Sequence, residues 1–500
     1  MNEVIVLPEP PLEFRYGQAV EDPHDGLSLF GPVDTDDGQH PRSVSYCAIG
    51  SRAGLELFAA FSKEFALPQF ADPDTDPRLW PTFPGFESAF ACHWPQAPTR
   101  SLEIDGDALD GETRDLDANK RASAVVDRYL AEIAKLVQRD DRIDVAICIV
   151  PDSVYARCRP QSRIPAAQGV GHAISGRTKK AREAGQTDLW SSYDPTIYQY
   201  SVDFRRQLKA RCMQHGIPIQ IVRESTLIPH PPEKPGTRRL TPLSDRVWNL
   251  AVAIFYKAGG KPWRLKTTRD GVCYIGLAYR QKDPASGTPE AACAAQMFLD
   301  SGDGIVFMGR FGPWYSPKRG SFHLSKSAAR DLLAGTLRTY KDLDGPPLKE
   351  IFLHCRSGIG YEEFQGFKEA CPSGVKLTGV RVQRDRLQTR LFREGTRPVL
   401  RGTFWKLNER TGLLWASGYK PRLATYDGWE TPAPLRIDIQ HGEADITQVA
   451  ADIFGLTKLN YNACRLGESE PVTVGFSDAV GEILVSNPVP DPSPKFKFYI

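Results

Sequence analysis

The sequence contains no run of about 18 apolar residues, the length that a helix needs to cross a bilayer. Its first residues, MNEVIVLPEPPLEF, lack the charged and apolar regions of a secretory signal peptide. The ten cysteines are scattered, without a C-x-x-C pair or a Cys/His cluster at zinc spacing. We therefore expect a soluble, cytoplasmic protein with buried thiols and with no membrane contact, zinc site or disulfide framework.

A strong net charge is also missing. The 500 residues carry a formal net charge of only +2, which excludes a polybasic tail or a uniformly basic surface. A nucleic acid would have to bind in a local groove, and two basic runs could supply one, although each could equally be an ordinary solvated surface. The basic residues are Arg177, Lys179, Lys180 and Arg182 in the first run, and Arg381, Arg384, Arg386, Arg390, Arg393 and Arg397 in the second.

Apolar patterns indicate several α/β domains. Five hundred residues with 41% apolar content suggest two to four domains with substantial cores. Residues 1–45 are rich in proline, glycine and aspartate, and we expect them to form an extended leader. After them, apolar strands such as 143–150 alternate with amphipathic helices such as 119–139, a pattern typical of an α/β layer with a mainly parallel sheet. We place this first domain at about 1–260.

The second half, placed at 261–500, begins with a series of strands. No repeat or low-complexity segment interrupts it. The expected strands are 271–280, 304–310, 348–355 and 375–383, and the expected helices between them are 324–343 and 361–370. The whole chain is therefore expected to belong to the α/β class.

Two cations share one face of a predicted helix in the first half. Arg205 and Lys209 lie four residues apart in a segment whose apolar residues Phe204, Leu208 and Cys212 repeat at helical spacing. A glycine and a proline after position 215 are expected to end this helix. Taken alone, such a pair of cations is usually a solvated helix face.

A neutral donor and a third cation follow on separate elements. Gln220 lies in the β-rich run 217–222, and Lys257 ends an amphipathic helix for which Ser244 is the expected N-cap. Two or three cations and a neutral donor can converge on one phosphate group. A lysine in a last helical turn can also simply compensate the helix dipole. As surface cations, these lysines are expected to contribute little to stability.

This segment resembles the MID domain of Argonaute proteins. In that family, the 5′ phosphate of the guide is held by an aromatic or basic residue, a lysine one turn later, a glutamine on the next strand and a lysine in a K-x-G-G turn. The matching residues here are Arg205, Lys209, Gln220 and Lys257, and Asn249 matches the family's N-x7-K pattern. The first position is often tyrosine, and a further lysine of some members is Ala253 here. The resemblance therefore implies phosphate binding with less stacking on the first base.

The second half resembles the PIWI domain, which has an RNase H-like fold. Residues 400–421, 430–439 and 456–484 are similar to C-terminal segments of Argonautes, and residues 9–34 are similar to the opening of short prokaryotic Argonautes. The resemblance implies a short Argonaute, in which a Rossmann-like MID domain precedes an RNase H-like PIWI domain. No room is left for N and PAZ domains.

Carboxylates are missing where this resemblance places the active site of a two-metal nuclease. A pair of Mg²⁺ ions needs several carboxylates to hold it. Active relatives carry one aspartate on the opening strand and another in an R-D-G turn, and Ala278 and Ser357 stand at those positions here. The last position falls between Phe476 and Asp478, whereas Glu362–Glu363 fit a helix N-terminus. The resemblance therefore implies a PIWI domain that does not cleave.

A guided protein without catalysis would act as a sensor. The resemblance implies a nucleic-acid sensor of a prokaryotic immune system, which binds a 5′-phosphorylated guide RNA and recognises complementary single-stranded DNA. It would activate an APAZ-domain effector, of TIR, Sir2-like or nuclease type, as a heterodimer. The resemblance also implies Mg²⁺ at the guide 5′ phosphate, held partly by the carboxylate of Ile500, although the apolar tail could equally only pack.

Two other functions remain open. The chain could be a stand-alone guided endonuclease with an unusual active site, which Mg²⁺-dependent cleavage of a paired target would reveal. It could also be a non-guided single-strand-binding subunit on the same fold, which would show no preference for a 5′ phosphate over a 5′ hydroxyl.

Overall fold

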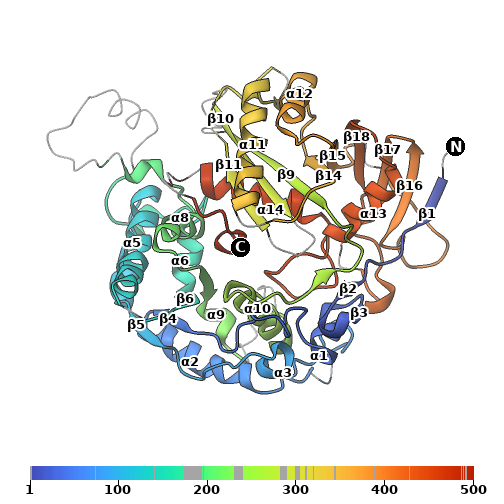
Figure 1. Cartoon of the computed structure of the whole chain (residues 1–500). Coiled ribbons are helices and arrows are strands. Elements are labelled where there is room, and N and C mark those ends of the chain that lie inside the picture. Colours follow the sequence, from blue (N-terminus) through green and yellow to red (C-terminus); the bar gives the residue numbers. More distant parts are fainter. Residues whose placement is uncertain are drawn as a thin grey trace.

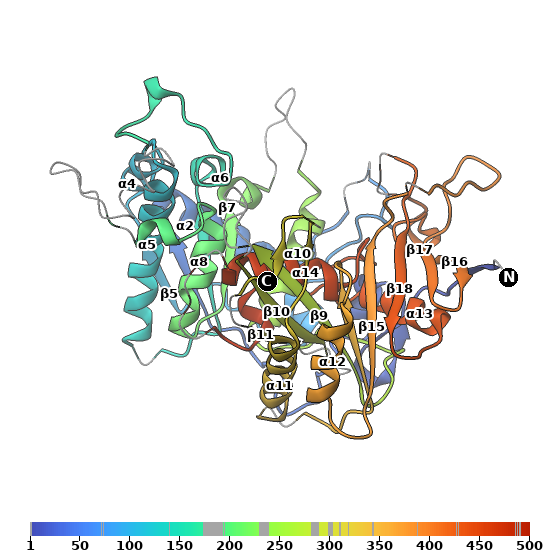
Figure 2. The ribbon, with the colours of Figure 1, turned by 90° about the horizontal axis from the view of Figure 1, so that it is seen from above.

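Two β-sheets organise the computed structural model of the chain (Figures 1 and 2). A four-stranded sheet belongs to the first half and a nine-stranded sheet mainly to the second, with the C-terminal end of the chain between α8 and α14 (Figure 1). The structure describes residues 3–71, 73, 75–139, 141–173, 194, 196–229, 240–281, 290–298, 304–309, 312–318, 320–342, 345–387, 389–426, 428, 430–485, 487, 489 and 492–500.

The four strands of the smaller sheet are all parallel, in the order β5-β4-β6-β7, which confirms the expected parallel layer. Their bounds are Tyr46–Gly50 (β4), Arg100–Glu103 (β5), Val145–Val150 (β6) and Ile219–Arg223 (β7). Strand β6 is apolar throughout because helices bury both of its faces. The helices are α2 (Arg52–Ala66) and α10 (Leu243–Lys257) on one face, and α5 (Ala118–Val137) and α8 (Phe204–Cys212) on the other.

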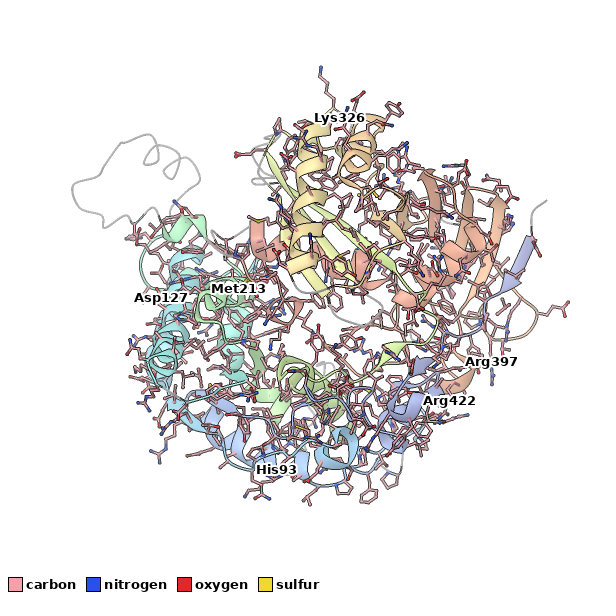
Figure 3. The ribbon with its side chains drawn as sticks, viewed as in Figure 1. His93, Asp127, Met213, Lys326, Arg397 and Arg422 are labelled. Carbon is pink, nitrogen blue, oxygen red and sulfur yellow. The ribbon has the colours of Figure 1, made fainter. Side chains whose placement is uncertain are left out.

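Aspartate caps set the starts of α5 and α8. Asp117 accepts from two backbone N–H groups at the start of α5, and Asp203 accepts from the N–H of Arg205 at the start of α8. The two helices lie side by side, and Asp127 of α5, which is labelled in Figure 3, forms an ion pair with Arg211 of α8 at 2.6 Å. Gly216 adopts φ 69°, so it ends the α8 region as the sequence predicts.

The predicted N-cap of α10 is wrong. The helix begins at Leu243 after Pro242, and Ser244 lies inside its first turn, where it is buried. At the other end, Gly259 has φ 106°, and a side chain at Gly260 would place its first carbon 2.2 Å from the Phe255 ring. Glycines are therefore required at positions 259 and 260, which follow Ala258.

The larger sheet is mixed, in the order β1-β16-β17-β18-β15-β14-β9-β10-β11. Strand β14 pairs in parallel with β9 and β15, and the other pairs are antiparallel. The strands are β1 (Glu3–Val6), β9 (Val272–Gln281), β10 (Ala291–Phe298), β11 (Gly304–Met308), β14 (Glu350–Cys355), β15 (Lys376–Arg384), β16 (Thr403–Asn408), β17 (Thr411–Trp415) and β18 (Leu435–His441). Four of these strands match the predicted segments, whereas the alanine-rich β10 was not predicted.

Alternate residues of β9 face different helices. Ile275 and its odd-numbered neighbours pack on the side of α11 (Lys326–Asp342) and α12 (Tyr361–Ala370), both of which match the predicted helices. On the opposite side, α14 (Val472–Val485) comes so close that a side chain at Gly276 would meet the backbone of Thr473. The helix α13 (Ile446–Leu456) packs on β16 and β17.

Shorter elements complete the fold. They are β2 (Leu12–Glu13), β3 (Ala19–Val20), α1 (Pro23–Leu29), α3 (Phe86–Phe90), α4 (Gly106–Glu112), α6 (Asp152–Arg157), α9 (Glu224–Leu227), β8 (Arg264–Leu265), β12 (Tyr315–Ser316) and β13 (Ser321–Phe322). No described helix has both the length and the apolar character that a membrane span requires. All ten cysteines lie among the described residues as free thiols, and nine are buried.

The expectation of an extended leader over residues 1–45 is wrong. Strand β1 pairs with β16 in the larger sheet, and Leu12, Phe14 and Leu27 are fully buried. These elements are only two to seven residues long, which is too short for a clear apolar period in a segment rich in proline and glycine. The sequence therefore did not indicate them. The domain boundary at residue 260 stays a prediction, and the first strand of the chain lies with the second half.

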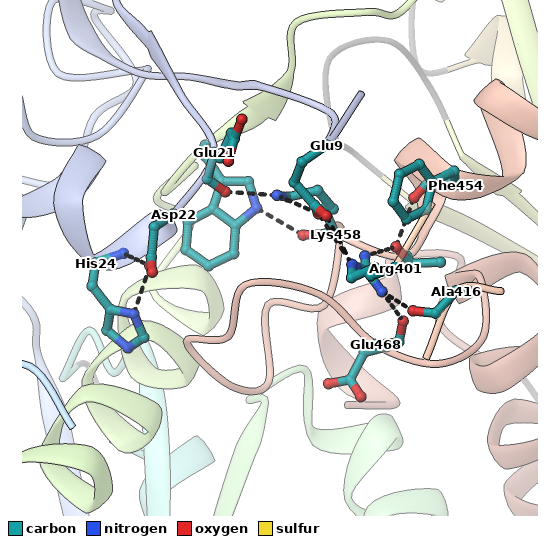
Figure 4. Close-up of polar contacts among 11 residues, drawn as sticks. Glu9, Glu21, Asp22, His24, Arg401, Ala416, Phe454, Lys458 and Glu468 are labelled. Carbon is teal, nitrogen blue, oxygen red and sulfur yellow. Dashed lines mark hydrogen bonds and ion pairs between the residues drawn. The ribbon is translucent and has the colours of Figure 1, made fainter. Parts of the chain in front are cut away.

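A buried ionic cluster holds the first residues against the second half (Figure 4). Glu9 pairs with Arg401 at 3.0 Å and with Lys458 at 3.0 Å, and both of these cationic side chains are almost completely buried. Arg401 also donates to the backbone carbonyls of Ala416 and Glu468. Burial tends to raise the pKa of Glu9, but the two cations outweigh this effect and lower it. The cluster therefore depends on an ionised Glu9.

Glu9→Gln should lower the free energy of unfolding at pH 7 by about 3 kcal/mol, because it leaves two buried cations without their anion. The contribution of Glu9 is present above the unfolded pKa of about 4.3 and is lost as the pH falls through the lower folded value. Urea unfolding at several pH values measures both effects. Glu3→Gln, at an exposed position of β1, is the control and should change stability by less than about 0.5 kcal/mol. An equally small effect of Glu9→Gln would contradict the assignment.

Candidate anion-binding site

A cavity of about 540 Å³ lies along β7, the edge strand of the four-stranded sheet. Elements of the first half form most of its wall, and α14 and the C-terminal tail close it from the second half. Its lining residues are Tyr155, Arg205, Arg206, Lys209, Gln220, Ile221, Val222, Arg223, Thr226, Arg246, Asn249, Leu250, Lys257, Asn462, Ala479, Glu482, Ile483, Tyr499 and Ile500. The structure thus brings all of the sequence-predicted phosphate-site residues, and Ile500, to one cavity.

Two lysines of this cavity bind neutral oxygens. Lys257 is only 1% exposed, and its Nζ donates to Oε1 of Gln220 at 2.5 Å. The Nζ of Lys209 donates to the backbone carbonyl of Tyr499 at 3.2 Å. A second contact fixes the C-terminal tail, residues 495–500: the Nζ of Lys497 donates to the backbone carbonyl of Lys257 at 3.1 Å. Side chains from α8, β7, α10 and the tail therefore meet at one point.

Burial makes it difficult for these two lysines to stay charged. It lowers the pKa of Lys209 to about 8, with a further contribution from Arg205. Burial and then the neighbouring Lys209 lower the pKa of Lys257 well below its usual value. Among the described residues, neither lysine forms an ion pair with a carboxylate. The expectation of a surface cation is therefore wrong for Lys257, whereas Lys209 is half-buried, and a bound anion would stabilise the charged forms of both.

Arg205 is held in position by the residue that caps its own helix. Its guanidinium donates to both carboxylate oxygens of Asp203 at 3.4 Å, and Asp203 is 2% exposed. The Arg205 side chain is 38% exposed. These contacts aim the guanidinium at the cavity while leaving part of its hydrogen-bonding capacity for a ligand.

Asn249 contributes to the construction of the cavity. Its Oδ1 accepts from the backbone N–H of Cys464 at 2.9 Å, which fastens a loop of the second half to α10. Next to this contact, the rings of Tyr256 and Tyr461 stack at 4.7 Å. Only the amide nitrogen of Asn249 could donate to a ligand in the cavity.

Sequence reasoning missed Tyr155, which lines the same cavity from α6. Its ring lies 4.3 Å from the Arg223 guanidinium and 5.6 Å from that of Arg205. An aromatic ring is therefore present although Arg205 occupies the position that is often tyrosine in Argonautes. The sequence does contain one indication of this role: Tyr155 lies in the short helix that follows strand β6. Ligands of parallel sheets bind outside the carboxyl ends of the strands, so residues in such a segment are candidates for a binding site.

Ala278 and Ser357, where the sequence resemblance leads us to expect aspartates in a nuclease, belong to neighbouring segments: Ala278 lies inside β9, and Ser357 follows the end of β14. The parallel register pairs Leu277 of β9 with Cys355 of β14, so Ala278 and Ser357 follow one and two residues later. Ala278 is 2% exposed and faces α14, where an added side chain at Gly481 would lie 3.5 Å from its Cβ. An apolar contact therefore occupies the space beside Ala278.

The other sequence candidates lie elsewhere. Phe476 packs against Phe496 at 5.2 Å, whereas the side chain of Asp478 lies outside the described residues. Glu363 accepts from the backbone N–H of Gly360, which confirms that the Glu362–Glu363 pair begins a helix. The run Arg177, Lys179, Lys180 and Arg182 also lies outside the described residues. Of the second run, Arg384 pairs with Glu470 and Arg397 contacts Tyr419, and no described member lines the cavity.

The fold is shared with Argonaute proteins. The chain is similar to a structure of Clostridium butyricum Argonaute bound to a guide DNA and a 19-mer target DNA, with 14% identity and a TM-score of 0.63, covering 100% of this chain and 55% of that one. It is also similar to Aa-Ago with externally bound siRNA, with 14% identity and a TM-score of 0.54, covering 99% and 55%. The chain thus spans just over half the length of these Argonautes. At this identity the likeness shows the fold alone. No protein-family model and no curated protein match the sequence.

Lys257→Met should raise the free energy of unfolding at pH 7 by about 1–2 kcal/mol, because it removes a charge that burial disfavours. The folded pKa of this lysine lies below its unfolded value of about 10.4, so its cost is present at neutral pH and disappears as the pH rises toward 10.4. The gain should therefore shrink in alkaline solution. Chemical unfolding at pH 7 and pH 10 tests this. Lys63→Met, at an exposed position of α2, is the control. A destabilised Lys257→Met variant would contradict the assignment.

Proposed function

We propose that the cavity binds the 5′ phosphate of a nucleic-acid guide strand. The observation that carries the proposal is the meeting of the buried Lys257 and the half-buried Lys209 in the cavity lined by Gln220, without an ion-paired carboxylate among the described residues. A phosphate would accept charge-assisted hydrogen bonds from both ammonium groups, and the Arg205 guanidinium could add a third. The volume of about 540 Å³ leaves room for the first nucleotide beside Tyr155.

The strand bound there would pair with a complementary strand. The Clostridium butyricum Argonaute structure contains both a guide and a target DNA, and its likeness to this fold supports the same arrangement here. We propose that residues 1–260 correspond to a MID domain and residues 261–500 to a PIWI domain. The guide would be RNA and the target single-stranded DNA. Base pairing would then supply sequence specificity, while protein contacts position the guide backbone.

We further propose that this chain does not cut its target. Ala278 lies inside β9 and Ser357 follows the end of the adjacent β14, where a two-metal site would need carboxylates. Neither side chain can bridge a pair of metal ions. The reporting activity would then belong to a partner, an APAZ-domain effector that binds this chain in a prokaryotic immune system. The family resemblance alone supports that last step.

A magnesium ion beside the guide phosphate fits the cavity if phosphate oxygens and water supply most of its ligands. Mg²⁺ binds oxygen ligands and retains several waters. A free carboxylate on the buried Ile500 would provide one ligand, but Lys209 and Lys257 lie close by and would repel a bare cation. The residues therefore fit a Mg²⁺ ion whose remaining ligands are phosphate oxygens and water. When bound, it would add positive charge at the phosphate.

Replacing both lysines, as Lys209→Met with Lys257→Met, should reduce the preference for a 5′ phosphate over a 5′ hydroxyl by at least about 100-fold, because two charge-assisted bonds are lost. Binding of a ~20-nucleotide RNA with either end, by the purified chain with Mg²⁺, measures this preference. Lys63→Met with Lys341→Met removes the same charge from exposed positions and should leave the preference intact. Retention of the preference in the folded cavity variant would refute the phosphate site. No preference in the natural chain would support a non-guided single-strand-binding subunit.

A complementary DNA added to the guide-loaded chain with Mg²⁺ should remain uncut, because Ala278 and Ser357 cannot supply the carboxylates that a two-metal site needs. Gel analysis of end-labelled target measures the cut fraction, and repeating the assay with a DNA guide tests the RNA assignment. Cleavage at one defined position opposite the guide would instead establish the stand-alone endonuclease. The same cleavage by the Lys209→Met, Lys257→Met variant would indicate a contaminating nuclease.

A further inference from the structure

The charge of the cavity is not uniform. Six of its side chains are cationic, and Glu482 is the one acidic side chain among the described residues that line it. The cationic residues are Arg205, Arg206, Lys209, Arg223, Arg246 and Lys257. A carboxylate in such a cavity repels a bound anion and weakens its binding, so Glu482 would be unfavourable there unless it had a separate role.

Two arginines on different elements hold this carboxylate in place. Arg206 of α8 pairs with Oε2 of Glu482, and Arg280 of β9 lies 3.3 Å from Oε1. Arg206 also lies 3.8 Å from Asp203. The carboxylate of Glu482 is thus fixed at both oxygens, and Arg206 is neutralised before any ligand arrives.

The fixed carboxylate lines the same cavity as the lysines that would bind a phosphate. Arg206 and Lys209 are three residues apart on α8, and such side chains are neighbours on a helix surface. Glu482 and Lys209 line the same cavity, Glu482 from α14 and Lys209 from α8. The cavity has a cationic end formed by Lys209 and Lys257 and an acidic position beside Arg206.

We propose that Glu482 determines which 5′ end the cavity accepts, by admitting a monophosphate and rejecting a triphosphate. This inference rests on the proposed guide-binding function. A monophosphate can lie wholly at the cationic end, whereas the additional phosphates of a triphosphate would extend toward a carboxylate that cannot move away. Size does not make this distinction, because about 540 Å³ has room for additional phosphate groups. Repulsion of the wrong ligand is a general means of specificity.

The test compares three RNAs of one sequence, with a 5′ hydroxyl, a 5′ monophosphate or a 5′ triphosphate, at one ionic strength. The natural chain should bind the monophosphate at least about tenfold more tightly than the triphosphate. Glu482→Gln should reduce this ratio about tenfold by strengthening triphosphate binding, because the repulsive charge is gone. Arg280→Gln removes one of the two arginine contacts of Glu482 but keeps the carboxylate, so it should retain or increase the ratio.

Ala479→Lys provides an independent variant. This exposed residue of α14 lines the cavity, so a lysine there counteracts the charge of Glu482 without breaking either ion pair. It should also reduce the ratio. Thermal unfolding identifies any variant that fails to fold. If Glu482→Gln does not fold, the binding ratio of Ala479→Lys decides the test.

Three results would overturn the inference: equal binding of the two phosphorylated ends by the natural chain, an unchanged ratio in both Glu482→Gln and Ala479→Lys, or an equal loss of the ratio in Glu482→Gln and Arg280→Gln. The last result would show that the ionic contact acts only by joining the two halves. Equal binding of the hydroxyl and the monophosphate would instead refute the proposed function itself.

Discussion

The enclosure of two lysines side by side is the constraint on which the cavity depends. Burial and mutual repulsion oppose the charges of Lys209 and Lys257, and the contacts described for them are with neutral oxygens of Gln220 and Tyr499. A chain selected for stability alone would place apolar side chains at such positions. The elements α8, β7 and α10 therefore maintain an arrangement that becomes favourable when an anion is present.

Both halves of the molecule contribute to this arrangement. The helix α14 packs on β9 near Gly276, and further along it carries Glu482 into the cavity wall. Asn249 and Tyr256 of α10 fasten a loop of the second half at the other side. A shift between the halves would change the distances among the charged groups of the cavity. Ligand binding and the packing of the larger sheet are thus connected through one helix.

Sequence patterns predicted the elements with strong local signals. The amphipathic α5 and the continuously apolar β6 fall where their periodicity placed them, and the family resemblance selected Arg205, Lys209, Gln220 and Lys257, which the fold brings together. The patterns could not indicate Tyr155 or Glu482, because these residues reach the cavity only through tertiary packing. The sequence could not indicate the burial of Lys257 either, because a lysine at the end of an isolated helix would be solvated. Strand β1 could not be predicted because it is short and because its partner, β16, lies about 400 residues away in the sequence.

The pairing of β1 with β16 has a consequence for how the protein is made. Residue 6 cannot find its partner until residue 403 has left the ribosome, so the larger sheet stays open at that edge during most of translation. The four parallel strands of the smaller sheet, in contrast, are complete at residue 223. The helix α14 and the tail that cover Lys209 and Lys257 are synthesised after both. A nascent chain therefore presents these lysines to water until α14, Tyr499 and Ile500 add their part of the cavity wall.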